Sequence, residues 1–421
     1  MKTIVHIAMH TTNIGDGALV KGIQSTLLAD MQTDIKFIDH CITDFLKYGR
    51  LKFDQEYVEW LNKNAILLLI GGGGLISEKN YLPALLEPNV LSKLKLPIVV
   101  YAIGHNLFYE ETLKHTATMS ALIAQVRDLG GLFSVRNDGS LERLQGDIGV
   151  SATDSVWEVP DPGLFVPVKR MHHPQIRPKQ RNVLLQFAGD KLSNRFWQGN
   201  PVNTAPTTGT RWNPFRKKKK EKRDKPTRQL DSSWAKIASA CNRISPNDSL
   251  NFFIAPHVHS DLNVTQNFIS AARDIPNFAS SRLEVCGIFR GANRAPGYFD
   301  LYRQADLVIG MRGHSIIASI GIGTPCVGIV SHPKVEGFLK DCGLEEWSTH
   351  ITDEHIEESL LEKASRLIND SSEWRRLRNI AMERMVQRRK EFHSAISKLM
   401  SLSLFLNESI LYVLRTAVVS F

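Results

Sequence analysis

Short apolar runs alternate with amphipathic stretches along the first part of the chain, and this alternation constrains the fold more than any other feature. The apolar runs lie at residues 3–9, 34–39, 65–70, 97–103 and 132–135. Strands that alternate with helices form a parallel sheet covered by helices on both faces. Continuous Ile, Leu and Val runs, as at residues 66–70, are typical of strands buried on both faces. The pattern therefore predicts an α/β fold.

The alternation breaks once and then begins again, which predicts two α/β domains. Residues 160–181 are rich in Pro, His, Lys and Arg and are typical of an interdomain linker. Apolar runs return at residues 182–187, 250–255, 282–286, 306–310 and 325–330. We expect Rossmann-like domains over residues 1–165 and 180–350, facing a cleft, and a helical tail over residues 352–421. A chain of 421 residues is long enough for two such domains.

One polar segment, residues 191–228, fits neither half and becomes intensely basic over residues 216–228. A loop of this length inside a compact domain is usually functional or disordered. Lysines at this density repel one another and remain solvated. We interpret residues 191–228 as a surface insertion into the second domain, and an anion-binding arm is the alternative.

The net charge, the cysteines and the apolar runs bound the class of protein. A net charge of +9 indicates acidic partners, without choosing among phosphorylated substrate, anionic glycan, anionic lipid and nucleic acid, and charge that only keeps the protein soluble is the alternative. The five cysteines show no C-x-x-C spacing, so they predict neither a zinc site nor a disulfide framework, as expected in a reducing cytosol. The first residues are typical of a buried strand rather than a secretory signal, and no apolar run is long enough to span a bilayer. We expect a cytoplasmic protein.

Two glycine-bearing motifs follow predicted strands in the first half. The first, Asn13-Ile14-Gly15-Asp16-Gly17, precedes a helix whose first amides can hold an anion, and a simple helix cap at Asp16 is the alternative. The second, residues 71–74, is predicted as a loop at the carboxyl end of a strand, where parallel sheets bind ligands. Consecutive glycines cost conformational entropy, so their presence favours close approach of a ligand to the backbone. Neither motif has the spacing of a dinucleotide-binding or Walker motif.

Charged residues follow three further predicted strands. Arg136 ends one strand and is expected to reach the cleft, whereas Asp138 and Ser140 are expected to cap the next helix. Arg312 and His314 lie between a strand and a helix, where an arginine pairs bidentately with carboxylate or phosphate and a histidine exchanges a proton.

His332 and Lys334 follow the neighbouring strand and add a further cation beside Arg312. Together these side chains predict a pocket for a small, multiply charged anion. An ion-paired arginine and a histidine at the start of a core helix are the alternative.

His257 and His259 end another predicted strand, two residues before Asp261. This spacing is compatible with metal ligands, but no further cluster of ligands accompanies it. We expect His257 to line the cleft and predict no metal site.

These motifs, in this order, resemble the polysaccharide pyruvyl transferase family. The matching residues are 13–16, 71–74, 134–136 with Ser140, 311–314, 323–329, 332–335 and Phe338. The resemblance spans most of residues 1–345, and the C-terminal motif is similar to that of bacterial members that pyruvylate cell-wall polymers. Members of the family usually carry a larger residue at the position of Gly313. The family's aspartate after the first domain corresponds to either Asp154 or Asp161.

The resemblance implies a two-domain fold like that of the GT-B glycosyltransferases. It also implies transfer of pyruvate from phosphoenolpyruvate, as donor substrate, to two hydroxyls of a sugar in a polysaccharide or its precursor, with release of phosphate. The expected catalytic residues are His314 and Arg312. The expected donor-binding residues are Arg312, Lys334, His332 and His257. The expected acceptor-binding residues are Asn13, Asp16, Gly72, Gly73, Gly74 and Arg136.

Other functions fit parts of the sequence. A GT-B nucleotide-sugar glycosyltransferase needs a base pocket and usually a carboxylate for the ribose, and Glu336 is the nearest candidate. A non-enzymatic polyanion-binding protein would use residues 216–228, but these lack the interleaved aromatic residues of base-stacking surfaces, so we expect no specific nucleic acid. In a third interpretation, the enzyme uses this basic run to hold an anionic lipid-linked acceptor at the inner face of the membrane.

Overall fold

The computed structural model describes residues 2–31, 34–109, 111–195, 224–244, 250–273, 275, 283–288 and 292–418, with only the backbone at 224–231 and 403–418. The basic run falls largely outside these residues, since only residues 191–195 and 224–228 of the predicted insertion are described. Residues 224–228 belong to a helix.

The first domain is built on a parallel sheet with strand order β2-β1-β3-β4-β5-β6 among the described residues. Its strands are β1 (Lys2–Ala8), β2 (Ile35–Cys41), β3 (Leu67–Ile76), β4 (Ile98–His105), β5 (Leu132–Arg136) and β6 (Val156–Val159). Its helices are α1 (Ile14–Met31), α2 (Ile42–Leu46), α3 (Gln55–Asn64), α4 (Tyr81–Leu85), α5 (Pro88–Leu91), α6 (Thr116–Asp128) and α7 (Ser140–Ile148). The predicted strands of this half are confirmed, and β6 is an additional short strand.

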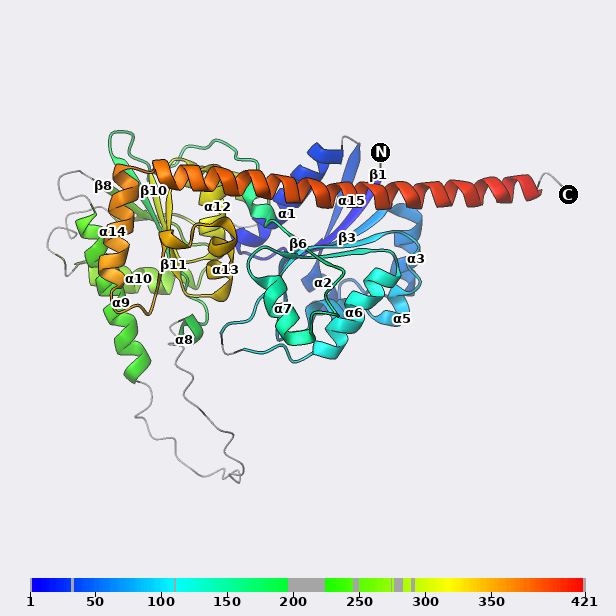
Figure 1. Cartoon of the computed structure of the whole chain (residues 1–421), viewed down its shortest axis with the longest axis horizontal. Coiled ribbons are helices and arrows are strands. Elements are labelled where there is room, and N and C mark those ends of the chain that lie inside the picture. Colours follow the sequence, from blue (N-terminus) through cyan, green and yellow to red (C-terminus); the bar gives the residue numbers. More distant parts are fainter. Residues whose placement is uncertain are drawn as a thin grey trace, which may run out of the picture.

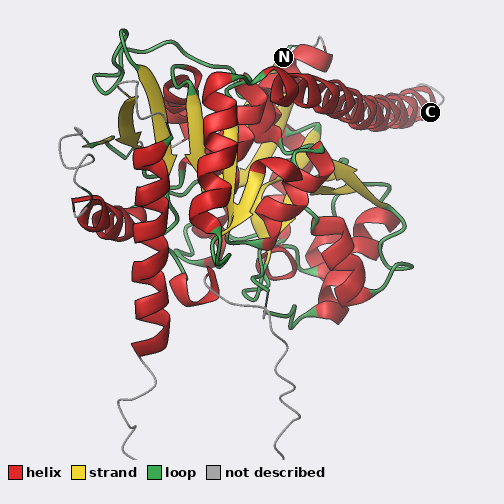
Figure 2. Cartoon of the chain, turned by 60° about the vertical axis from the view of Figure 1, so that its left-hand side comes forward, coloured by secondary structure: helices red, strands yellow, loops and turns green. Residues whose placement is uncertain are grey.

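The second domain repeats this architecture around a second parallel sheet, with strand order β12-β11-β10-β7-β8-β9 among the described residues. Its strands are β7 (Arg181–Gln186), β8 (Leu250–Ile254), β9 (Glu284–Val285), β10 (Leu307–Gly310), β11 (Cys326–Val330) and β12 (Ser348–His350). Its helices are α8 (Leu192–Arg195), α9 (Asp224–Arg243), α10 (Asp261–Arg273), α11 (Ala295–Arg303), α12 (Gly313–Ile322), α13 (Pro333–Cys342) and α14 (Ile356–Asn369). Helices lie on both sides of the strands (Figure 2). The predicted class, two Rossmann-like α/β domains, is confirmed.

The glycine run of residues 71–74 does not form the predicted loop. These glycines continue β3 as far as Ile76, with a register shift against β4 between Gly73 and Ile76. Gly72 and Gly73 adopt positive φ angles of 77° and 116°, a region that favours glycine. The prediction fails because the strand distorts without ending, so that pairing with β4 resumes beyond the glycines.

The last helix, α15 (Ser372–Val418), runs along both domains (Figure 1). Trp374 and Met385 pack in the core of the second domain, whereas Phe392 and Ile396 pack against the sheet of the first. Arg388 joins the domains, because its guanidinium lies 2.6 Å from Glu158 and 3.0 Å from Asp341. No helix within the described residues is long and apolar enough to cross a membrane.

Candidate active site

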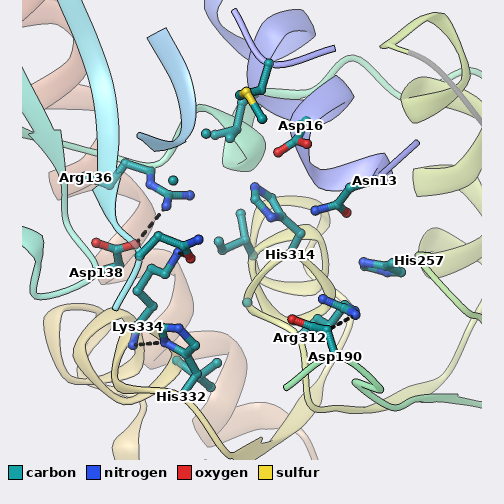
Figure 3. Close-up of a pocket in the computed structure, with 18 of the residues that line it drawn as sticks. Asn13, Asp16, Arg136, Asp138, Asp190, His257, Arg312, His314, His332 and Lys334 are labelled. Atoms are coloured by element: carbon teal, nitrogen blue, oxygen red, sulfur yellow. Dashed lines mark hydrogen bonds and ion pairs between the residues drawn. The ribbon is translucent and has the colours of Figure 1, made fainter. Parts of the chain in front are cut away.

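A cavity of about 300 Å³ lies between the carboxyl ends of the two sheets (Figure 3). The first domain contributes residues that follow, end or lie within its strands, including Asn13, Asp16, Gly73, Gly74, Asn106, Phe108, Arg136 and Asp138. The second domain contributes Asp190, Lys191, Arg195, His257, Arg312, His314, His332 and Lys334. The structure therefore brings together all the sequence-predicted site residues except Gly72, which packs against Leu19 of α1.

The start of α1 forms one wall of this cavity. The Asn13 side chain accepts a hydrogen bond from the Gly15 amide at 3.1 Å, so Asn13 rather than Asp16 caps the helix. Asp16 accepts a hydrogen bond from the Thr11 hydroxyl. Burial raises the pKa of Asp16, although this hydrogen bond and nearby cations oppose the shift.

Two glycines, Gly74 in β3 and Gly104 in β4, make room for neighbouring side chains. A Cβ at Gly104 would collide with the guanidinium of Arg136, and a Cβ at Gly74 would lie 2.6 Å from Cβ of Asn106. Gly74 thus serves the packing of Asn106, in addition to lining the cavity.

Arg136 is a buried cation held by two aspartates. Its Nη1 donates to Asp161 at 2.9 Å, and its Nη2 lies 3.3 Å from Asp138. Burial would lower the pKa of Arg136, but these carboxylates outweigh burial and raise it, so the side chain stays charged. Asp161 is fully buried here, whereas Asp154 is exposed in a turn. Asp161 is therefore the aspartate that belongs to the site.

Asp138 and Ser140 are not the helix caps that the sequence predicts. The residue that precedes α7 is Gly139, and no side chain caps this helix. The Ser140 hydroxyl donates to Asp138 and accepts from the amide of His105 at 2.8 Å. Ser140 and Asp138 instead link the end of β4 to the segment after β5. Asp138 does not cap the helix because its carboxylate pairs with Arg136.

Arg312 precedes α12 and is tied to two carboxylates. Its Nε donates to Asp261 at 2.9 Å, and its Nη2 lies 2.5 Å from both Asp261 and Asp190. Its backbone amide donates to Gln186 at 2.8 Å. The guanidinium is positioned at the cavity wall with two of its three nitrogens already engaged.

Sequence reasoning missed Asp190 and Arg195, because both fall at the edge of the polar segment that we interpret as an insertion. One feature of the sequence could have indicated them, because they follow the predicted strand at residues 182–187 just as the other site residues follow their strands. Arg195 donates to both oxygens of Asp190 at 3.1 Å and to the Ser331 hydroxyl at 3.1 Å. Burial would raise the pKa of Asp190, but Arg195 and Arg312 outweigh burial and lower it to about 2.

Lys334 reaches the same cavity from the start of α13. Its ammonium donates to Oδ1 of Asn106 at 2.5 Å, and no carboxylate forms an ion pair with it among the described residues. Burial, with further repulsion from Arg136, lowers the pKa of Lys334 to about 7. A cation without an acidic partner is a natural site for an anionic ligand.

Three histidines of the cavity each have a buried ring nitrogen without a hydrogen-bond partner. These atoms are Nδ1 of His257 and Nε2 of His314 and His332. Burial, reinforced by neighbouring cations, lowers the pKa of His314 to about 3 and that of His332 well below its usual value. Burial likewise lowers the pKa of His257 to about 3. These rings are therefore neutral near pH 7.

No group of three or more His, Cys, Asp or Glu within the described part of the chain is arranged to hold a metal ion. The cavity is lined by Arg136, Arg195, Arg312, Lys334 and neutral imidazoles, and two of its three lining aspartates, Asp138 and Asp190, are already paired with arginines. Such a set suits an anionic ligand better than a cation.

Two domains with parallel sheets whose carboxyl ends face one cationic cavity define the GT-B class. A protein from Listeria monocytogenes assigned as a UDP-N-acetylglucosamine 2-epimerase has the same fold, with a TM-score of 0.52 and 11% identity over 90% of this chain and 91% of that chain. The UDP-GlcNAc 2-epimerase of Neisseria meningitidis gives a TM-score of 0.51 and 10% identity over 96% of this chain and all of that chain (100%). At such identities the likeness shows the fold alone.

The family model described as polysaccharide pyruvyl transferase matches residues 13–333. The chain therefore belongs to the polysaccharide pyruvyl transferase family. No curated protein matches its sequence.

Proposed function

We propose that this protein transfers pyruvate from phosphoenolpyruvate to two hydroxyls of a sugar in a polysaccharide or its precursor, forming a ketal and releasing phosphate. The observation that carries the proposal is the set of Arg312, His314 and Lys334 around one small cavity in a member of this family. Phosphoenolpyruvate carries a carboxylate and a phosphate on a three-carbon skeleton, so it needs several cations close together.

The second domain holds the donor in this proposal. Lys334 offers an ammonium without a carboxylate partner, and Arg312 and Arg195 offer guanidinium groups that suit planar or phosphate oxygens. Neutral His332 and His257 add a ring nitrogen each that lacks a protein partner. Fixed cations of this kind also stabilise the charge that moves onto the leaving phosphate.

His314 transfers the proton. Burial first, and then Arg136, Lys334 and Arg312, lower its pKa, and the negative charges of a bound donor would raise that pKa by offsetting these cations. The protonated ring then donates to the methylene carbon of phosphoenolpyruvate, which leaves an oxocarbenium-like centre at C2. Proton transfer of this type contributes typically about 10²–10⁴-fold to rate.

Two sugar hydroxyls then attack C2 in turn, and the C2–phosphate oxygen bond breaks between the two additions. One hydroxyl proton replaces the proton that the methyl group gained, and the other leaves with phosphate. Asn13, Asp16, Gly73 and Gly74 lie on the first-domain side of the cavity and would bind this acceptor, together with Arg136. Asp16, whose pKa is raised by burial, is the carboxylate suited to accept a hydroxyl proton.

Purified protein, phosphoenolpyruvate and a panel of bacterial glycans and nucleotide- or lipid-linked sugars test the proposal. We expect acceptor-dependent phosphate release and a product whose mass increases by one pyruvyl ketal. Thermal stabilisation by a nucleotide sugar, with none by phosphoenolpyruvate, would contradict the proposal and favour glycosyl transfer.

The basic run at residues 216–228 extends the proposal to the acceptor, as an arm that holds an anionic lipid-linked sugar at a membrane surface. Deleting residues 216–225 tests this extension. We expect loss of binding to anionic vesicles and weaker activity on a lipid-linked acceptor, with unchanged activity on a water-soluble one. Retention of both properties would contradict the extension and leave the transfer reaction untouched.

A further inference from the structure

The two carboxylates that hold Arg312 differ in how firmly the protein fixes them. Asp261 is 1% exposed and accepts hydrogen bonds from the backbone amides of His257 at 2.9 Å and Gly189 at 3.0 Å. Asp261 also accepts a hydrogen bond from Nε of Arg312 at 2.9 Å. Asp261 is therefore a permanent anchor that cannot leave without breaking several buried hydrogen bonds.

Asp190 is the other carboxylate, and its side chain is 42% exposed. It contacts Nη2 of Arg312 at 2.5 Å and Nη2 of Arg195 at 3.1 Å. A half-exposed carboxylate regains hydration when it turns toward water, and this hydration offsets part of the pairing that it loses. Within one cavity, the same guanidinium thus has one fixed partner and one exchangeable partner.

We propose that Asp190 is an internal stand-in for an anionic group of the donor, which occupies Arg312 and Arg195 while the site is empty and turns away when the donor binds. The geometry matches, because a planar carboxylate between two guanidinium groups is the arrangement that a donor carboxylate or phosphate would adopt. Without such a stand-in, two adjacent buried cations would repel each other in the empty site. The identity of the donor as phosphoenolpyruvate rests on the proposed function.

The backbone around Asp190 is held in place, so only its side chain needs to move. The backbone carbonyl of Asp190 accepts a hydrogen bond from Nε of Arg195 at 2.9 Å, and the Lys191 ammonium lies 2.6 Å from Glu111 of the first domain. The Arg195 guanidinium stacks on the ring of Phe108 at 5.2 Å from the centroid. These contacts hold Lys191 and Arg195 across the interdomain cleft, and none of them involves the Asp190 carboxylate.

The proposal fixes the sign of a mutational effect. A donor that must displace an internal competitor binds only to the fraction of molecules in which the competitor has turned away. Its apparent dissociation constant is therefore the intrinsic constant divided by that fraction. Asp190→Asn removes the competing charge and keeps the side-chain volume. We expect the dissociation constants of both phosphoenolpyruvate and inorganic phosphate to fall by roughly 3–10-fold.

Asp261→Asn is the matched variant, because it makes the same change on the other partner of Arg312. We expect it to weaken the binding of both anions by about 10-fold or more, since the guanidinium loses its fixed anchor. Circular dichroism melting of both variants shows whether they remain folded. Asp190→Asn changes a half-exposed side chain, so its binding data test the proposal even if Asp261→Asn does not fold.

Isothermal titration calorimetry of the wild-type chain and both variants measures the dissociation constants of phosphoenolpyruvate and inorganic phosphate. Tighter binding by Asp190→Asn supports the stand-in, whereas unchanged or weaker binding overturns it and makes Asp190 a structural partner of the arginines. Wild-type protein that binds phosphate but neither binds nor consumes phosphoenolpyruvate would contradict the proposed function alone. The phosphate titrations of the variants would still decide the role of Asp190.

Discussion

Nε2 of His314 lies 3.8 Å from Oδ1 of Asp161, too far for a hydrogen bond although close enough for electrostatic attraction once the ring is protonated. That oxygen accepts from the Gly163 amide at 2.8 Å, and the other oxygen of the carboxylate accepts from Arg136 at 2.9 Å. Asp161 is therefore engaged elsewhere, and Nε2 of His314 has no partner. A buried polar atom without a partner is costly, and a ligand in the cavity can supply the missing hydrogen bond.

Replacing His314 tests its role in proton transfer. We expect His314→Ala to lower kcat by about 10²–10⁴-fold, because it removes the group that exchanges a proton. His314→Gln is the companion variant, since it retains a hydrogen-bonding group but cannot take up a proton near neutral pH. Steady-state kinetics with phosphoenolpyruvate should show both variants to be similarly slow, and near-normal turnover of either would exclude His314 as the acid.

A subtler change at Gly15 should disturb the same imidazole from the opposite domain. A Cβ at Gly15 would collide with Nδ1 of His314, so Gly15→Ala must displace the ring. We expect kcat to fall by about 10-fold or more, because misplacing a catalytic group by ångströms is costly, while the affinity for phosphoenolpyruvate changes little.

Gly146→Ala is the control for this substitution, because Gly146 also lies in a helix and a Cβ there meets no atom within 4 Å. It should leave kcat unchanged and raise stability slightly, by roughly 0.5–1 kcal/mol. Equal kinetics for Gly15→Ala and Gly146→Ala would show that His314 does not need its present position.

The sequence predicts the sheets and most of the cavity because each depends on local patterns. Apolar runs mark the strands, and chemistry-bearing residues such as Arg136, Arg312 and Lys334 follow strands directly, so parallel topology brings them together. These inferences need no knowledge of which side chains meet.

Pairings between distant residues are a different matter. Nothing local indicates that Arg312 is shared between Asp261 and Asp190, or that Asp161 rather than Asp154 meets Arg136. The distorted glycine run of β3 is equally non-local, because a Cβ at Gly71 would collide with the carbonyl oxygen of Tyr101 on β4. Such features follow from packing across the sheet, which composition and periodicity do not encode.

Arg312→Lys should weaken donor binding without unfolding the protein. A lysine retains the charge but cannot engage Asp261 through two nitrogens and also present a planar face to the cavity. We expect KM for phosphoenolpyruvate to rise by about 10–100-fold, which corresponds to one or two lost charge-assisted hydrogen bonds. Kinetics over a wide range of donor concentration measure this rise, and an unchanged KM would place the donor away from Arg312.

Lys334→Met should raise stability and abolish donor binding. The pKa of Lys334 is lowered from 10.5 to about 7 by burial and by the repulsion of Arg136. Between these values the unfolded chain binds more protons than the folded one, so the contribution of Lys334 to stability rises with pH from about 7 to 10.5. Below pH 7 Lys334 is protonated in both the folded and the unfolded state, and its burial and its repulsion by Arg136 lower the free energy of unfolding by their full amount.

The variant should therefore melt above the wild type at about pH 6, and the difference should shrink at about pH 9. For domains of this size, each 1 kcal/mol shifts the melting temperature by roughly 2–4 °C. Calorimetric titration with phosphoenolpyruvate then measures donor binding by the variant. We expect no binding, because a buried cation that lowers stability is explained by its contact with the ligand. A variant that melts below the wild type at the lower pH would show that the contact between Lys334 and Asn106 outweighs the repulsion. A variant that still binds phosphoenolpyruvate normally would remove Lys334 from the donor site.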